Sequence, residues 1–305
     1  MKKQRLARWG KRALEQQKRK RRWGDRNDGR LLRSLSPMMK IMPYIMPQRC
    51  DACNSFRGSM EIGAVERYVR EKREQGLANF SILHVLLAAY LRLVSQRPGL
   101  NRFVSGQKIF ARNRFEAMLC IKKEMKLNSP DSVISMIFPL DATAEQVYAI
   151  TEKLIEEARN EQTGFDDTAR ILDYIPGLFK KFAFWLLRTI DYFGLLPMKL
   201  KHLSPFHGSL FITSMASLGL PPIYHHIYNF GNVPVFIAFG VTEKKHVLKK
   251  DGAIEEQKVL NYTLVMDERI CDGYYYASAF RMFNGILRSP QQLDQPPEKV
   301  VEDVD

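Results

Sequence analysis

The segment from Met266 to Gly273 is the part of the chain in which charged side chains are best placed to do chemistry. It carries Glu268 and Asp272 between a strand-like run and a helix-like run, so both carboxylates should lie at the turn between two elements. A carboxylate there can act as a general acid or base if its surroundings raise its pKa. Two plainer interpretations stay open: Glu268 is a solvated acid at a strand end, and Asp272 caps the following helix.

Histidines and cysteines offer fewer candidates for catalysis or metal binding. His225 and His226 follow two prolines in a loop, where they either supply an imidazole or lie at the surface. His84 lies in an apolar helix-like run, and we expect it to be a hydrogen-bonded core residue. Cys50 and Cys53 form one C-x-x-C pair without a second pair, whereas a zinc site needs four ligands as a rule. We therefore expect no metal site.

Several short motifs follow one another in an order that resembles the catalytic domain of the 2-oxo acid dehydrogenase (dihydrolipoyl) acyltransferases, whose fold includes chloramphenicol acetyltransferase. Asp267–Gly273 is similar to the family's D-H-R-x-x-D-G signature, with Glu268 in the place of the histidine. Gly208–Gly219 is similar to its F-T-I-S-N-L-G region, and Pro98–Phe103 to its P-x-x-N-R-F turn. The resemblance implies the same fold over most of the chain.

The exchange of histidine for glutamate determines how well the family's chemistry can work. The resemblance implies that Glu268 is the catalytic base, because the family's histidine takes a proton from the thiol of coenzyme A or of a dihydrolipoyl group. With ordinary pKa values of about 8.5 for a thiol, 6.5 for imidazole and 4.3 for glutamate, this transfer is uphill by about 2.7 kcal/mol to histidine and about 5.7 kcal/mol to glutamate. Glu268 therefore needs burial that raises its pKa by about 2 units, and an inward-pointing Arg269 would oppose that rise.

The resemblance assigns roles to five further residues. Ser214, with Thr213 as the alternate, corresponds to the hydroxyl that donates a hydrogen bond to the tetrahedral oxyanion. Asp272 corresponds to an aspartate that forms a salt bridge with an arginine and shapes the loop, and Arg49 is our candidate for that arginine. Gly273 is expected to permit close packing where the strand turns into the helix.

The elements that must position these residues predict an α+β fold, in which helices pack on a mixed sheet. Strands are indicated at Ser55–Ile62, Lys108–Ala111, Ala117–Lys122, Leu210–Thr213, Val235–Val241 and Val259–Met266. Helices are indicated at Ala64–Glu74, Ile82–Gln96, Ala142–Ala158, Phe165–Tyr174, Gly177–Phe193 and Tyr274–Leu287. The helix from Ile82 to Gln96 is apolar on nearly every side, so we expect it to be deeply buried.

Charge divides the chain into a basic tail and a nearly neutral body. Residues 1–35 contain 14 Lys or Arg against three acids, 14 − 3 = +11, within a net charge of +14. We expect residues 1–36 to be a disordered or helical tail, 37–290 an acyltransferase-like domain, and 291–305 an acidic flexible end. The tail predicts attachment to nucleic acid or to an anionic surface, or else it is a solubilising arm without a partner.

The composition, with 45% hydrophobic and 11% aromatic residues, predicts a folded core and excludes a disordered chain. We expect no transmembrane segment, because a span needs roughly 20 apolar residues and the most apolar stretch, Phe179–Leu196, contains four charged side chains. Four scattered cysteines favour a reducing compartment, so we expect a cytoplasmic location.

The resemblance favours acyl transfer between a coenzyme A thioester and an unknown small-molecule or thiol acceptor, in a site between the subunits of a homotrimer. Whether the chain is an enzyme depends on Glu268. The alternatives are a catalytically inactive scaffold with the same fold, or an oligomeric platform whose basic tails bind nucleic acid or an anionic surface. Complex-forming family members carry an N-terminal lipoyl domain, and we expect none here because residues 1–36 are too few to form one.

Overall fold

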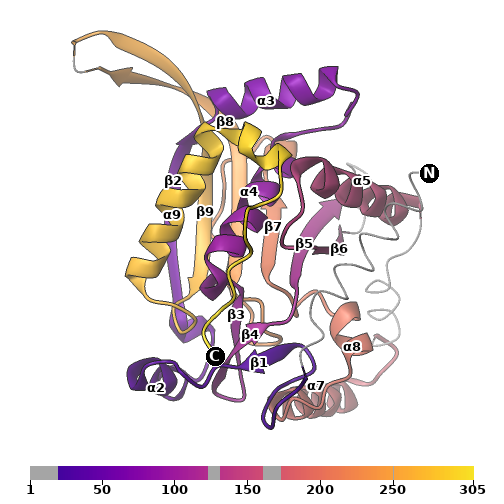
Figure 1. The fold of residues 1–305 in the computed structure, drawn as a ribbon. Coiled ribbons are helices and arrows are strands. Elements are labelled where there is room, and N and C mark those ends of the chain that lie inside the picture. Colours follow the sequence, from indigo (N-terminus) through magenta and orange to yellow (C-terminus); the bar gives the residue numbers. More distant parts are fainter. Residues whose placement is uncertain (1–19, 123–130, 161–172, 250) are drawn as a thin grey trace.

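The computed structural model describes residues 20–122, 131–160, 173–249 and 251–305. Its main feature is a six-stranded sheet with the order β2-β9-β8-β7-β5-β6 (Figure 1). The β5–β7 and β7–β8 pairs are parallel and the other pairs are antiparallel, which confirms the predicted α+β fold with a mixed sheet. Its strands are β2 (Cys53–Glu61), β5 (Phe115–Lys122), β6 (Asp131–Phe138), β7 (Leu210–Ser214), β8 (Val235–Leu248) and β9 (Ile254–Asp267).

Helices cover one face of this sheet (Figure 1). They are α3 (Gly63–Glu74), α4 (Ile82–Gln96), α5 (Ala144–Asn160) and α9 (Gly273–Arg288). Eleven of the 15 residues of α4 are buried, as its all-round apolar pattern predicts. His84 on this helix is 2% exposed and its Nδ1 accepts a hydrogen bond from the backbone N–H of Ser81 at 3.1 Å, so the expected core histidine is confirmed.

The opposite face of the sheet is covered by extended chain rather than by helices. Ile227 and Val233, from the stretch between β7 and β8, belong to a second apolar cluster with side chains of β5, β7, β8 and β9. Within that cluster the rings of Phe211 and Phe236 stack with their centroids 4.6 Å apart. This stretch therefore packs on the sheet face that includes β7, the strand that carries both candidate hydroxyls.

A small three-stranded sheet joins the N-terminal segment to the body. It has the order β1-β4-β3, from β1 (Gly29–Leu31), β3 (Arg102–Ser105) and β4 (Lys108–Arg112), and Leu32 and Leu35 are buried in the main core. Residues 25–36, which we expected in the tail, thus pack on the body. A count of charges misses this, because it does not show that the aspartates and leucines of the segment have partners elsewhere.

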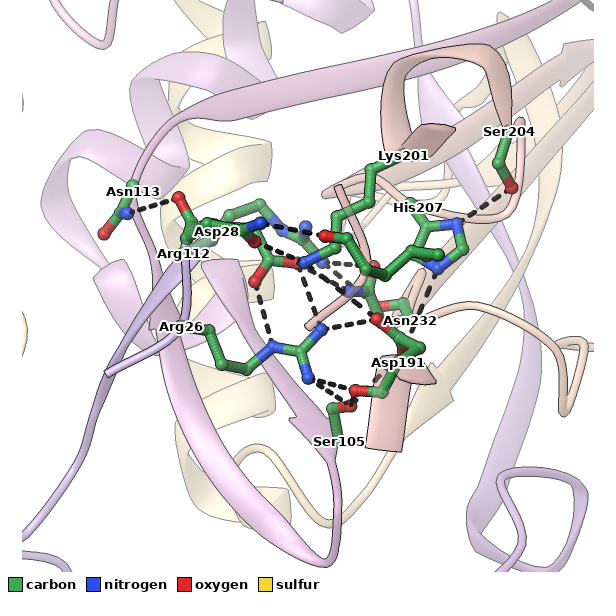
Figure 2. Close-up of polar contacts among 12 residues, drawn as sticks. Arg26, Asp28, Ser105, Arg112, Asn113, Asp191, Lys201, Ser204, His207 and Asn232 are labelled. Carbon is green, nitrogen blue, oxygen red and sulfur yellow. Dashed lines mark hydrogen bonds and ion pairs between the residues drawn. The ribbon is translucent and has the colours of Figure 1, made fainter. Parts of the chain in front are cut away.

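A buried cluster of charges holds the same segment in place (Figure 2). Arg26 donates from Nε to Asp28 Oδ1 at 2.9 Å and from Nη2 to Asp191 Oδ1 at 2.6 Å. Lys201 Nζ lies 2.8 Å from Asp28 Oδ2. Burial alone would raise the pKa of Asp28, but Arg26 and Lys201 outweigh burial and lower it to about 2. Each buried charge therefore has an opposite charge beside it, as burial requires.

The C-terminal residues run across α4 (Figure 1). Arg102 donates from Nε to Asp303 Oδ2 at 2.7 Å, and the backbone N–H of Val301 donates to the carbonyl of Ser95 at 2.8 Å. Segment 291–305, which we expected to be flexible, therefore makes ion pairs and backbone hydrogen bonds with the body. Asp303 and Asp305 pair with the arginines Arg102 and Arg30, and Asp294 pairs with Lys72, all of which lie far away in the sequence.

Several further elements differ from the predicted ones. The segment before β2 contains helix α2 (Pro37–Ile45), which was not predicted. Strands β3 and β6 and the short helix α8 (Met198–Leu203) were not predicted either. Helix α7 (Gly177–Tyr192) was predicted, whereas the predicted helix Phe165–Tyr174 lies mostly outside the described residues. Within the described part of the chain, no helix is long and apolar enough to cross a membrane.

Candidate functional site

Glu268 directly follows β9, in the turn that leads into α9. Its backbone N–H donates to the carbonyl of Ala52 at 2.9 Å, so the position is fixed against the residues that open β2. Its carboxylate Oε2 accepts a hydrogen bond from Asn54 Nδ2 at 2.6 Å. The side chain is half-buried. The carboxylate is thus oriented by one amide and still open on part of its surface, and sequence reasoning gave no sign of Asn54.

The neighbouring Asp267 is fully buried between two arginines. Arg269 donates from Nε to Oδ1 at 2.8 Å and from Nη2 to Oδ2 at 2.7 Å, while Arg49 donates from Nε to Oδ2 at 3.3 Å. Arg49 also donates from Nη1 to the carbonyls of Tyr228 and Gly231, at 2.7 and 2.9 Å. Burial lowers the pKa of Arg49, and Asp267 opposes that change. Arg269 therefore points into the protein, as the less favourable case for Glu268 requires, but its guanidinium group binds the carboxylate of Asp267.

The expected salt bridge between Arg49 and Asp272 is wrong, since Arg49 binds Asp267. The register explains the difference, because β2 pairs with β9 so that Cys53 lies opposite Asp267. Arg49 precedes Cys53 by four residues, so its side chain lies beside the end of β9 and not beside the start of α9. Asp272 is exposed and caps α9, where its Oδ1 accepts the backbone N–H of Tyr275 at 2.8 Å. The capping interpretation of Asp272 is confirmed.

The close-packing role expected for Gly273 is also wrong. A Cβ added at this first residue of α9 would meet no atom within 4 Å, and its φ is not positive. Gly231, which supplies a carbonyl to Arg49, is the glycine that the site requires. Its φ is +83°, and a Cβ there would overlap the carbonyl oxygen of Phe206.

The two candidate hydroxyls lie at the end of β7 and point to opposite faces of the sheet, because side chains alternate along a strand. Ser214 shares its face with Ile212, which packs in the main core beneath the helices. Thr213 shares the other face with Phe211, which belongs to the second cluster. Both are half-buried. A single oxyanion can therefore use one of them, not both.

The strand register places Ser214 and Glu268 far apart within one chain. Ser214 pairs with Phe239 on β8, and Phe239 pairs with Tyr262 on β9. Glu268 follows Tyr262 by six residues, which is about 20 Å at about 3.3 Å per residue. The structure therefore does not bring the two together in a single copy. A site that uses both needs two chains.

His225 lies on the sheet face of Thr213. Its ring stacks on Phe236, with centroids 4.2 Å apart and planes at 12°. Burial lowers the pKa of His225, because it disfavours the protonated imidazole. His226 packs edge-on against Tyr228 instead. His225 is thus a stacked, half-buried imidazole on the face opposite Ser214, and the pair of histidines does not act as one unit.

Comparison with known proteins agrees with the order of the motifs. Residues 207–294 match the family described as the 2-oxoacid dehydrogenases acyltransferase (catalytic domain). This segment contains β7, β8, β9 and α9, and therefore both candidate catalytic regions. A search among curated protein sequences gives no match.

Solved acyltransferase cores have the same fold. The cubic core of the pyruvate dehydrogenase multienzyme complex is 14% identical and aligns over 86% of this chain and 93% of its own, with a TM-score of 0.56. Dihydrolipoamide acetyltransferase of Azotobacter vinelandii is 15% identical with the same coverage and TM-score. A probable dihydrolipoamide acetyltransferase from Listeria monocytogenes is 14% identical, with coverage of 88% and 97% and a TM-score of 0.54. The predicted resemblance is confirmed, and the exchange of the signature histidine for Glu268 stays a prediction.

Proposed function

We propose that the protein transfers an acyl group from a coenzyme A thioester to a small acceptor, in a site formed between two copies of the chain. The observation that carries this proposal is the match of residues 207–294 to the acyltransferase catalytic domain, on a fold shared with solved acetyltransferase cores. Glu268 of one copy would face Ser214 of the next. The strand register supports the two-copy arrangement, because it separates these residues within one copy.

The proposed reaction uses the two side chains at successive steps. Glu268 takes the proton of the acceptor's thiol or hydroxyl, whose sulfur or oxygen then attacks the carbonyl carbon of the thioester. The Ser214 hydroxyl donates a hydrogen bond to the oxyanion of the tetrahedral intermediate. Collapse of that intermediate breaks the carbon–sulfur bond, and the thiolate of coenzyme A takes the proton back from Glu268.

The solved relative from Azotobacter offers a partial precedent. In that enzyme a serine, a histidine and an asparagine four positions after the histidine have roles in the catalytic mechanism. In this chain Glu268 and Asp272 have the same spacing, and Ser214 is the matching hydroxyl. Because Asp272 caps α9 here, we propose that it positions the turn and carries no proton.

Exposed apolar residues support contact between copies near Ser214. The stretch that follows β7 places large apolar side chains in solvent, namely Leu218, Leu220, Ile223 and Tyr224. A monomer rarely exposes a contiguous apolar patch of this kind without a partner. We propose that this stretch lies at the contact between the subunits of a trimer, next to the site.

A second candidate function is a scaffold that keeps the fold without the chemistry. This function is favoured by the presence of glutamate at position 268. Proton transfer from a thiol to an ordinary glutamate is less favourable than transfer to an ordinary histidine, by about 3 kcal/mol. In this case the basic residues at the start of the chain would provide the function, through nucleic acid or an anionic surface. Removal of residues 1–19 tests that role and leaves the Arg26 cluster intact, with RNA binding measured at two salt concentrations.

Release of free thiol from acetyl-coenzyme A, measured with candidate acceptors, tests the acyl transfer. Wild type should turn over, Glu268→Gln should lose activity by at least about a hundredfold, and Ser214→Ala should lose it by about ten- to a hundredfold. Thr213→Val is the matched control on the other face of the sheet and should retain activity. Activity only in Glu268→His would support the scaffold derived from an enzyme. No turnover in any variant, with each acceptor, would contradict the acyltransferase proposal.

A further inference from the structure

Helix α7 carries an apolar stripe that faces solvent. None of its 16 residues is buried, and its inner side touches the body through contacts such as that of Phe184 with Phe230, whose ring centroids are 5.4 Å apart. The outward side, which we call the α7 face, has side chains that are 41% to 79% exposed. Its members are Leu178, Phe179, Phe182, Trp185 and Leu186. Their spacing places them on one side of the helix.

The charges around the α7 face are mainly positive. Between residues 174 and 203 the only acid is Asp191, which is turned inward and bound by Arg26. The basic side chains that reach solvent in this range are Lys180, Lys181, Arg188 and Lys199. Lys180 also lies 3.5 Å from Asp173, an exposed acid just before this range. The apolar stripe is therefore bordered mainly by positive charge.

The most basic part of the chain joins the body close to α7. Arg26 binds Asp191 in the last turn of α7 (Figure 2), and Lys20 precedes Arg26 by six residues, a reach of about 20 Å. Residues 1–19 contain eight Lys or Arg and one acid, Glu15. Trp23, on the path between them, is 98% exposed. Lys20, to which residues 1–19 are attached, therefore lies within about 20 Å of the last turn of α7.

Helix α2 lies at the same end of the molecule as α7 (Figure 1). It carries Lys40, and its exposed large apolar side chains are Met38, Ile41, Tyr44 and Ile45. Two separate helices therefore place apolar and basic side chains at one end, in a domain that has a complete core elsewhere.

We propose that this end of the molecule docks on an anionic lipid bilayer, with the α7 face inserted at the level of the headgroups and the basic residues on lipid phosphates. Aromatic and leucine side chains bordered by lysine and arginine are typical of helices that lie in the plane of a membrane interface. At 16 residues, α7 is about 24 Å long and too short to span the apolar layer. The inference does not depend on acyl transfer.

Two other occupants fit the observations less well. Nucleic acid would pair with the basic side chains, but it would leave the leucines and the wide apolar stripe exposed. A second copy facing the same surface would bring the two basic regions together, and like charges oppose that contact. A bilayer with anionic headgroups satisfies both the apolar and the basic side chains.

Co-sedimentation of the full-length protein with phosphatidylcholine vesicles, with and without phosphatidylglycerol, tests the proposal. Wild type should bind the anionic vesicles, and Phe182→Ser/Trp185→Ser should weaken that binding by about tenfold or more. The matched control is Leu248→Ser/Ile254→Ser, because both side chains are 71% exposed at the far hairpin of β8 and β9. This control should bind as wild type does, and circular dichroism should show that both variants are folded.

Fluorescence of Trp185 gives a second measurement. The chain has three tryptophans, so Trp9→Phe/Trp23→Phe leaves Trp185 alone. Its emission should shift to the blue on anionic vesicles, and lipids with brominated acyl chains should quench it. Vesicle binding without either change would mean that only the basic tail touches lipid and would overturn the proposal. Binding to RNA without binding to vesicles would also overturn the proposal. A wild type that does not bind vesicles, together with a smaller oligomer for Phe182→Ser/Trp185→Ser, would overturn it as well.

Discussion

Replacement of Asp267 with asparagine should destabilise the protein far more than replacement of its neighbour Glu268 with glutamine. Both changes remove one negative charge and keep the size of the side chain. Asp267, however, is fully buried and accepts hydrogen bonds from the guanidinium groups of Arg49 and Arg269. Glu268 is half-buried and accepts one hydrogen bond, from the amide of Asn54.

The difference in burial between Asp267 and Glu268 determines how much each substitution should change the free energy of unfolding. Without the charge of Asp267, two buried guanidinium groups lose the anion between them, and loss of one partner of a buried pair costs about 3–5 kcal/mol. The amide of a glutamine at 268 still offers an oxygen to Asn54, and a half-exposed charge is partly screened by water. We therefore expect Glu268→Gln to change the free energy of unfolding by less than about 1 kcal/mol.

Urea unfolding at one fixed protein concentration measures both variants. With a dependence on urea of about 3 kcal/mol per M, the midpoint of Asp267→Asn should fall by about 1 M or more. Glu268→Gln should stay within about 0.3 M of wild type and serves as the matched control. A midpoint for Asp267→Asn that also stays within about 0.3 M would refute the argument, because it would show that the charge of Asp267 is not needed by the two arginines.

Three further predictions concern stability. The pKa of Asp28 is lowered to about 2 from an ordinary 3.8, so its carboxylate should contribute about 2 kcal/mol of stability above pH 4 and lose this contribution as the pH falls toward 2. The difference in the free energy of unfolding between wild type and Asp28→Asn, measured with urea, should therefore become smaller over that pH range. A difference that stays constant would contradict this prediction. Gly231→Ala should lower the melting temperature by several degrees, since its φ is +83° and Phe206 occupies the space, whereas Gly273→Ala should leave it nearly unchanged; equal effects would contradict this reasoning. The Tyr90 hydroxyl is buried and finds no hydrogen-bond partner among the described residues, so Tyr90→Phe should leave the melting temperature unchanged or raise it, and a clear drop would reveal an unseen partner.

The sequence was most informative where apolar periodicity is regular. The helix Ile82–Gln96 was predicted with the bounds that the structure has, because its apolar residues surround the helix between a cap and Pro98. Strand β9 was located because its end is rich in β-branched and apolar residues. Helix α2 was missed, since Pro43 within it reads as a break. Strand β6 was missed because its serines interrupt the apolar pattern.

The candidate site was harder to predict for a different reason. The motif located the turn that holds Glu268, but it could not tell which acid meets which arginine, since that depends on the register of β2 against β9. Asp267 was overlooked because an acid at the end of a strand usually lies in solvent. The predicted N-terminal tail, residues 1–36, was too long, because net charge does not show that Arg26 is paired and buried.

Because Asp267 binds the two arginines, the contacts that hold this turn in place are separate from the side chain of Glu268, which the turn presents. Backbone around position 268 is held by Arg49, by Arg269 and by the Tyr276 hydroxyl, which donates to the carbonyl of Asp267 at 3.0 Å. None of these contacts involves the Glu268 side chain. A chain built in this way tolerates exchange of the residue at 268 without refolding its surroundings, so one codon can change the side chain that the turn presents while the architecture persists.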